Sequence, residues 1–212
     1  MQLSARLRAL HRREDGFTLP ELVITVSIIG IIAAALTGVV ISYLKTTTDT
    51  QSRLTESHDV QFAAAYWQRD VSSIGVRGWD ATTKTFPLQQ SVDVTPACAL
   101  PAGTPVVTLA WSEYTSSDST ALPTTITVSY VAEPDAGGFN LIRVRCTGST
   151  RDSSVEVMHS LDTLPTVSCN TACTGTGPNV PTVVELQLSV SDPEGRGTTG
   201  FAATLAGERR QT

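Results

Sequence analysis

Hydrophobic residues concentrate in one uninterrupted stretch near the N-terminus. Residues 22–44 carry no charged side chain, and thirteen of these 23 residues are Leu, Ile or Val. Each such residue favours insertion by roughly 0.3–0.6 kcal/mol near the bilayer centre, so the stretch favours insertion by about 4–8 kcal/mol. As a helix it is about 34 Å long, enough for a hydrocarbon core of about 30 Å. The pattern predicts a transmembrane helix rather than a buried core helix, which usually carries a polar stripe.

The helical pattern continues beyond this stretch. No Pro or Gly occurs between Leu44 and Ile74, and Gly75 and Gly78 end the pattern. Apolar residues recur at intervals of four and three: Val60, Ala64, Trp67, Val71 and Ile74. Polar residues occupy the other faces: Gln51, Arg53, Glu56, Asp59, Gln68 and Asp70. The sequence therefore predicts one helix from Leu19 to Ile74, about 84 Å long, whose second half presents an apolar stripe to a C-terminal domain.

After Gly78 the period changes to short alternating or β-branched runs, which are typical of strands. The runs are 106–111, 125–131, 139–146, 155–159, 183–190 and 201–205. A turn signal at residues 134–138 predicts a hairpin, and residues 164–182, rich in Pro, Thr, Gly and Cys, predict a disulfide-stapled loop. About 135 residues can hold a core of their own. We expect an α+β fold, in which a long N-terminal helix packs on a C-terminal antiparallel β-sheet domain.

Charge sets the orientation of the apolar segment. Four arginines precede it, at positions 6, 8, 12 and 13, with only Glu14 and Asp15 as acids upstream of Gly16. The positive-inside rule keeps this end in the cytoplasm and predicts a single-pass protein with an extracytoplasmic C-terminal domain. The chain carries a net charge of −5 and has a pI near 5.1, which argues against a nucleic-acid binder.

The cysteines lie on the exported side: Cys98, Cys146, Cys169 and Cys173. An even number there predicts two disulfides, but the sequence does not choose among the three pairings. Cys169 and Cys173 have a spacing that suggests half a zinc site, yet no His or further Cys cluster completes one. No metal site is therefore predicted.

The residues that lead into the apolar segment read GFTLPELVI, from Gly16 to Ile24. With the basic leader and the following span, they resemble the prepilin processing site of type IV pilins and type II secretion pseudopilins. The resemblance implies that an inner-membrane aspartic peptidase cuts after Gly16 and methylates the amine of Phe17. Pro20 departs from the commoner aliphatic residue, although Pro is tolerated in the first turn of a helix.

Glu21 stands four residues after Phe17, where the family keeps its glutamate. A carboxylate in apolar surroundings is costly unless it is paired. The resemblance implies that Glu21 of an incoming subunit pairs with the Phe17 ammonium of a neighbour and so fixes axial register. The implied partners are the prepilin peptidase, other pilins or pseudopilins, and an inner-membrane assembly platform with its ATPase. An interfacial acid at the positive end of the helix is the structural alternative.

Small residues recur every four positions along one face of the span: Gly30, Ala34, Gly38 and Ser42. Such a strip allows close packing between helices, but the ordinary small-residue content of a membrane helix explains it equally well.

Residues 66–71, YWQRDV, resemble the arginine–aspartate segment of J-type minor pseudopilins and the related W-type minor pilins. The alternative is a helix surface that an aromatic pair anchors to a sheet. With the leader at 1–16, the long helix at 17–75 and the β-rich domain at 76–212, the resemblance implies a minor subunit of a type II secretion pseudopilus or a type IV pilus.

Three other functions compete with a filament subunit. A permanently anchored binding domain would keep residues 1–16, and a secreted protein would be cut after residues 33–35. An exported enzyme lacks support, because His58 and His159 lie near no nucleophile motif and no G-x-S-x-G elbow occurs. Residues 195–200 match G-x-G-x-x-G but precede a strand-like run instead of a helix. Asp192 and Glu194 are few ligands for calcium, so no cofactor is predicted.

Overall fold

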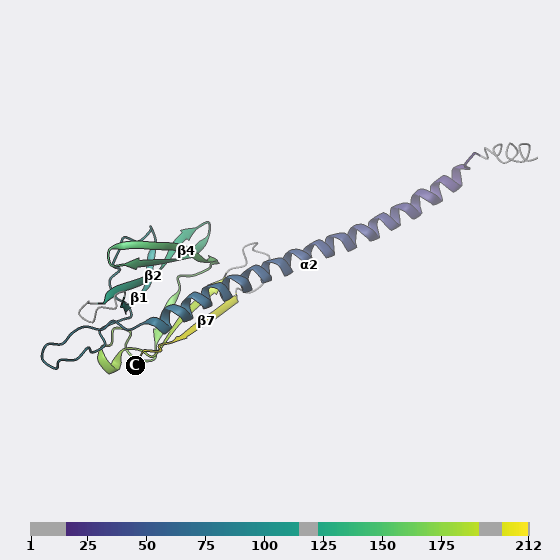
Figure 1. Ribbon diagram of the computed structural model, residues 1–212. Helices are drawn as coiled ribbons and strands as arrows, with labels where there is room; N and C mark the ends of the chain where they lie inside the picture. The colour runs from purple at the N-terminus through teal and green to yellow at the C-terminus, as the bar shows by residue number, and fades with distance from the viewer. Residues whose placement is uncertain (1–15, 115–122, 191–200, 212) are drawn as a thin grey trace, which may run out of the picture. The chain divides into compact units, whose positions relative to one another are not determined.

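The computed structural model describes residues 16–114, 123–190 and 201–211 (Figure 1). The chain divides into two compact units, with the boundary between Gln51 and Ser52. The first unit holds the apolar part of the long helix. The second holds the remainder of that helix and all the strands.

The long helix, α2, runs from Leu19 to Ser73 and confirms the predicted helix to within one residue. The Thr18 carbonyl accepts the first hydrogen bonds, from the backbone N–H groups of Glu21 and Leu22. Hydroxyl groups in the apolar part bond to the carbonyl four residues earlier, as Thr25 does to Glu21 at 2.8 Å. Ser27 and Thr37 do the same, also at 2.8 Å. In a bilayer, where no water is present to pair with hydroxyls, this arrangement satisfies them within the helix.

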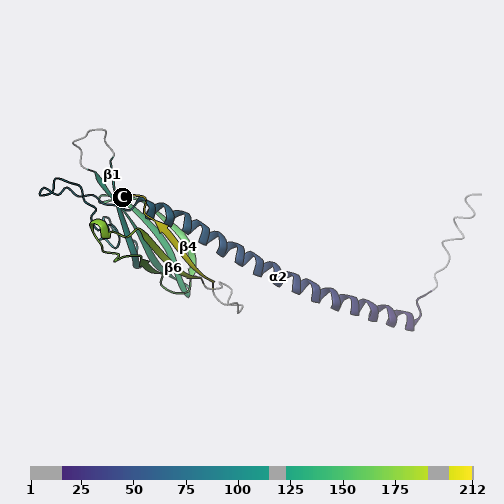
Figure 2. The same cartoon turned by 90° about the horizontal axis from the view of Figure 1, so that it is seen from below.

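The strands form a seven-stranded sheet made of two parts. An antiparallel meander comprises β1 (Thr104–Glu113), β2 (Thr124–Asp135), β3 (Gly138–Thr147) and β4 (Thr150–Leu161). The second part comprises β5 (Thr166–Cys169), β6 (Val183–Val190) and β7 (Phe201–Glu208), and a short 3-10 helix, η1 (Gly177–Asn179), lies between β5 and β6. β6 pairs with β5 and β7, and among the described residues only the pair Leu161–Val190 joins it to β4. Figure 2 labels β4 and β6 in the sheet.

The predicted hairpin is confirmed between β2 and β3. Its two-residue turn is Ala136–Gly137, and Gly137 has φ +96°, a conformation that favours glycine. Two expectations need correction. β4 is longer than 155–159, because residues from Thr150 onward pair with β3. Residues 164–182 are not only a loop, since they include β5 and η1.

Within the second unit, the predicted apolar stripe of α2 faces the sheet. Trp67, Val71 and Ile74 are fully buried, and Val60 and Ala64 pack at the margin of the same core. The Trp67 indole nitrogen donates a hydrogen bond to the Val184 carbonyl of β6 at 3.2 Å. The contact with β7 is close, because a Cβ placed on Gly207 would lie 2.5 Å from the Val71 Cβ.

A smaller group of residues packs on the other face of the meander. Ile142, Val144 and Cys146 of β3 point away from α2 and pack against Cys98 and Leu100. The segment before β1 therefore crosses the back of the sheet, while α2 crosses its front. β3 is consequently buried on both faces.

Two further segments complete the second unit near the end of α2. The segment after α2 covers the edge of β1: Gly75 N–H donates to the Ala110 carbonyl at 3.1 Å, and Ala110 N–H donates to the Ser91 carbonyl at 2.8 Å. The C-terminal residues cap α2 from the sheet side. Arg210 N–H donates to the Ser72 carbonyl at 3.2 Å, which satisfies one of the carbonyls left free at a helix end.

Candidate functional site

The processing motif lies at the start of the described chain. Gly16 and Phe17 precede the helix, and the Phe17 side chain is 78% exposed. Glu21 is also exposed and belongs to the first turn of α2. An acid there interacts favourably with the positive end of the helix dipole. Within the described chain, the Glu21 carboxylate makes no hydrogen bond or ion pair.

The apolar part of α2 forms the second component of this site. Residues Leu19–Thr48 make one helix that is long and apolar enough to cross a membrane, and the span is not buried by the rest of the chain. Its glycines have no intrachain packing role, since a Cβ on Gly30 or Gly38 would meet nothing within 4 Å. Ala34 lies on the same exposed helix.

A buried ionic network joins the other half of α2 to the sheet. Asp70 Oδ2 and Oδ1 accept hydrogen bonds from Arg143 Nε at 2.6 Å and Nη2 at 2.7 Å. The Tyr130 hydroxyl donates a third bond to Oδ2 at 2.7 Å. Asp70 is 1% exposed and Arg143 is 6% exposed, so the interpretation of Asp70 as part of a polar helix face is wrong.

Aromatic rings enclose this network. The Arg143 guanidinium lies 4.9 Å from the centroid of the Tyr66 ring, and the Trp67 and Tyr130 rings meet edge to face at 5.2 Å. Burial, and then the charge of Asp70, raise the pKa of Tyr130 well above 10. Burial lowers the pKa of Arg143, but hydrogen bonds to Asp70 and its charge outweigh burial and raise it overall. Tyr130 therefore stays neutral and the guanidinium stays charged.

Residues 11–37 match the family model of the prokaryotic N-terminal methylation motif, which is the signal of type IV pilins and pseudopilins. This motif supports a type IV pilin-like protein. No curated protein and no solved structure gives a significant match to it. The match covers the segment around Gly16, Phe17 and Glu21, together with Gly30 and Ala34.

The motif also indicates the general class of function of the pilin-like protein. The proteins that carry this motif form a structural rather than an enzymatic family, and the motif implies processing by a peptidase and assembly with other pilins. One N-terminal apolar helix fits a single-pass membrane anchor. The arrangement of a long helix and an antiparallel sheet agrees with a pilin-like fold.

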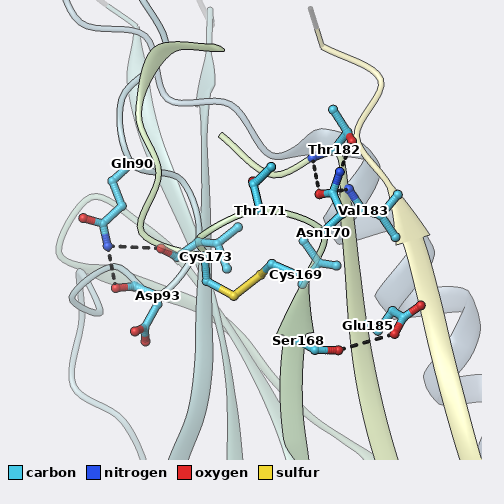
Figure 3. The surroundings of a disulfide bond; sticks show 12 residues. Gln90, Asp93, Ser168, Cys169, Asn170, Thr171, Cys173, Thr182, Val183 and Glu185 are labelled. Atoms are coloured by element: carbon cyan, nitrogen blue, oxygen red, sulfur yellow. Dashed lines mark hydrogen bonds between the residues drawn. A yellow bond between two sulfur atoms is a disulfide. The ribbon is translucent and has the colours of Figure 1, made fainter. Parts of the chain in front are cut away.

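The four cysteines of the pilin-like protein form two disulfides, one of the three pairings that the sequence left open. Cys98 pairs with Cys146 and so links the segment before β1 covalently to β3. Cys169 pairs with Cys173 and closes a tight loop after β5 (Figure 3). Beside it, the Asn170 side chain points toward the start of β6, and its Oδ1 accepts hydrogen bonds from Thr182 and Val183 N–H at 3.0 Å.

The two histidines considered for catalysis gather at another contact between α2 and β4. His159 Nδ1 lies 3.0 Å from Asp59 Oδ2, and its Nε2 lies 3.2 Å from Glu156 Oε1. His58 Nδ1 lies 3.8 Å from the other oxygen of Asp59. A carboxylate oxygen lies close to each ring nitrogen of His159, as expected for a polar contact between a helix and a strand.

The sequence analysis considered ligands for zinc and for calcium but predicted no metal site. Among residues 16–114, 123–190 and 201–211, no group of three or more His, Cys, Asp or Glu side chains is arranged to hold a metal ion. The calcium candidates Asp192 and Glu194, and the glycine-rich run 195–200, lie outside the described residues.

Sequence reasoning missed the Asp70–Arg143–Tyr130 network. One signal was available, because Arg143 interrupts an apolar strand run at a position that shares a face with Leu141. A charged residue on the core-facing side of a strand requires a partner. The sequence did not indicate which of the acids on α2 supplies it.

Proposed function

We propose that this type IV pilin-like protein is a minor subunit of a filament system, either a type II secretion pseudopilus or a type IV pilus. The observation that carries the proposal is the methylation motif at residues 11–37, joined to an exposed apolar helix of 30 residues. A chain that only needed an anchor would require the helix but not the acid in its first turn.

Processing is the first step of the proposed function. Cleavage after Gly16 releases a leader, residues 1–16, and leaves Phe17 as the N-terminal residue that is methylated. Gly16 and Phe17 precede the regular helix, so the peptide bond between them lies outside the hydrogen-bonded turns of α2. The leader arginines keep this end on the cytoplasmic side, with residues 76–212 outside.

Assembly is the second step. The Glu21 carboxylate has no partner within the described chain, and in apolar surroundings it is stabilised by a cation. The freed Phe17 ammonium of a neighbouring subunit supplies that cation. The open glycine positions on the same helix, Gly30 and Gly38, together with Ala34, let neighbouring helices approach closely and replace lipid contacts.

The minor role rests on the segment from Tyr66 to Val71, which resembles J-type minor pseudopilins and W-type minor pilins. In the pilin-like protein this segment contributes Trp67 and Asp70 to the core. This packing is also what a helix anchored to a sheet by aromatic residues requires, so the subtype rests on the resemblance alone. The assembly platform and its ATPase are partners of the same proposal.

N-terminal sequencing combined with mass analysis of the protein isolated from its native membrane tests processing. N-methyl-Phe17 is the expected N-terminus. An intact Met1 would indicate a permanent anchor, and a start at Leu36 would indicate a secreted protein; either result refutes the proposal.

A second experiment tests assembly separately. Glu21→Ala is expected to leave cleavage intact and to lower incorporation into sheared filaments, whereas Thr37→Ala, an exposed change on the same helix outside the processing motif, is expected to affect neither. Normal incorporation of Glu21→Ala would contradict the pairing of Glu21 with the Phe17 amine.

A further inference from the structure

Along most of their length, β1, β4 and β5 each have an edge without a neighbouring strand, and each edge is protected in a way that proteins commonly use. Residues 91–94 cover the edge of β1, since Ala110 N–H donates to the Ser91 carbonyl at 2.8 Å. β5 is only four residues long. β4 carries charged side chains and pairs with β3 through register shifts, which make its edge irregular.

β7, Phe201–Glu208, has none of these protections on its outer edge. All eight residues pair with β6 in one register without a bulge, so the edge is regular. The strand contains no Pro or Lys, and its single charged residue is Glu208, at the end. No other described strand pairs with β7 on that side. An edge of this kind is a template for an added strand.

Two hydrogen bonds just beyond β7 show which of its backbone groups point outward. Arg209 N–H donates to the Thr182 carbonyl at 2.8 Å, so the odd-numbered residues face β6. Arg210 N–H points the other way and donates to the Ser72 carbonyl at 3.2 Å. Because backbone groups alternate in direction along a strand, the even-numbered residues face outward. Their outward N–H and C=O groups make no hydrogen bond among the described residues: Ala202, Thr204, Ala206 and Glu208.

A groove of about 540 Å³ lies beside the end of this edge. Residues 206–210 form one wall, and Gln68 and Ser72 of α2 form the other. Figures 1 and 2 both show β7 alongside the second half of α2. Gln61 and Ala65 lie on the same helix face as Gln68, and all three are exposed. The helix thus presents a neutral wall of small and amide side chains to an added strand.

The spacing of the outward groups determines the class of occupant. The outward N–H and C=O groups recur on alternate residues, which are about 6.8 Å apart in a strand. An extended peptide backbone offers acceptors and donors at the same interval. A second polypeptide segment in the extended conformation therefore satisfies the whole row of groups at once.

Charge at the end of the edge narrows the sequence of that segment. Arg210 is exposed, and its guanidinium makes no hydrogen bond or ion pair among the described residues. Arg209 adds a second positive charge beside Glu208, although its Nε donates to the Pro181 carbonyl at 3.1 Å. This end of the edge is therefore cationic in a chain with a net charge of −5. A carboxylate on the added segment complements it, and sets register more than affinity because exposed ion pairs are weak.

We propose that the outer edge of β7 binds an extended acidic segment of another polypeptide chain, which joins the sheet as an additional antiparallel strand. Antiparallel pairing is slightly more stable per residue than parallel pairing. It places the N-terminal end of the added segment, with its carboxylate, beside Arg210. This interaction goes beyond the proposed filament role and does not depend on it, because it needs neither cleavage after Gly16 nor the pairing of Glu21.

Hydrogen exchange, resolved residue by residue in the full chain in lipid nanodiscs, tests the edge before any ligand is added. In the free protein the amides of residues 204, 206 and 208 should exchange fast, because they face outward. The amides of residues 203, 205 and 207 should exchange slowly, because they bond to β6. This alternation is the signature of an unpaired edge.

The probe is an octapeptide, blocked at both ends, in which an N-terminal aspartate precedes alternating threonine and valine. At ten times its dissociation constant it should slow exchange at residues 204, 206 and 208 about 11-fold, because only the free protein exchanges there. Two matched peptides carry N-methyl groups on the odd or on the even amides. They keep every side chain, and the one methylated on the side that faces β7 should give no protection.

A proline substitution tests the same edge from the protein. Ala206→Pro removes an outward N–H but no bond to β6, and Pro is tolerated at such positions of edge strands. It should abolish the protection of Thr204 and Glu208 by the peptide. Slow exchange at Leu205 and Gly207 would show that the variant is folded, and Thr204→Pro serves as a second variant.

The charge at the end of the edge is tested separately. Arg210→Asn should weaken peptide binding by about 1.4–5-fold, as expected for one exposed ion pair. Lys84→Asn, which removes a cation outside β7, is the matched control and should bind normally. Asn also tolerates the φ of +52° at Lys84.

Four results would overturn the proposal. Slow exchange at residues 204, 206 and 208 in the free protein would show that the edge is already covered. Dimerisation in analytical ultracentrifugation that Ala206→Pro abolishes would assign the edge to a second copy of this chain. The other two are the absence of any slowing by the octapeptide at its solubility limit, and equal protection by the octapeptide and both N-methylated peptides.

Discussion

The ion pair between Asp70 and Arg143 gives the sharpest prediction about the stability of the second unit. Removing one partner leaves the other charge buried, because both side chains are less than 10% exposed and each is the other's main source of hydrogen bonds. The informative perturbations are Asp70→Leu, Arg143→Met and the double variant. The double variant replaces a charged pair with apolar groups of similar volume.

The expected magnitudes follow from burial and geometry. Breaking a buried, doubly hydrogen-bonded pair by removing one partner costs about 3–5 kcal/mol. In a unit of this size, that loss lowers the melting temperature by about 6–20 °C. The double variant should lose clearly less free energy of unfolding than the two single variants lose together, because neither charge is left unpaired. Tyr130 loses its acceptor in either variant that lacks Asp70, so the double variant need not reach parent stability.

Urea unfolding of the full chain in nanodiscs, followed by tryptophan fluorescence and near-UV circular dichroism, measures these differences. The Trp67–Tyr130 edge-to-face contact should supply much of the near-UV signal. The double-mutant cycle then gives the coupling free energy between the two residues. Single-variant losses below about 1 kcal/mol, typical of exposed pairs, would refute the reasoning that this pair is desolvated.

Three further predictions concern the same unit. Because the pKa of Tyr130 is raised, the neutral Tyr130 hydroxyl stabilises the folded state below pH 10.0, and this contribution is lost as the pH rises above that value. Tyr130→Phe should flatten the decline in stability, as measured by urea midpoints at pH values below and above 10.0. Gly207→Ala should cost about 1–3 kcal/mol, as measured by thermal unfolding, because the new Cβ would crowd the Cβ of Val71. Replacing both cysteines of Cys98–Cys146 with alanine should lower the free energy of unfolding by about 4 kcal/mol, and the same change at Cys169–Cys173 by about 2 kcal/mol. The difference arises because the first disulfide closes the longer loop of the unfolded chain. Equal losses in urea unfolding would contradict this chain-entropy argument.

The one-dimensional features of this pilin-like protein could be predicted from the sequence. Hydrophobicity and helical period depend on neighbours along the chain, so the limits of α2 and its stripe at Trp67, Val71 and Ile74 were predictable. The turn at Gly137 and the strand at Val183–Val190 were predictable for the same reason. The processing segment at Gly16 is a local motif that a peptidase recognises, and it needed no tertiary information.

Features that join distant parts of the chain were decided by the tertiary structure. Asp70 and Arg143 are 73 residues apart, and only the crossing of α2 over β3 turns a helix-surface acid into a buried one. The choice among three disulfide pairings and the pairing of β6 with β5, β7 and one residue of β4 depended on the same packing. Local sequence fixes which residues seek burial or a partner, but the partner is selected by the global arrangement that satisfies all of them at once.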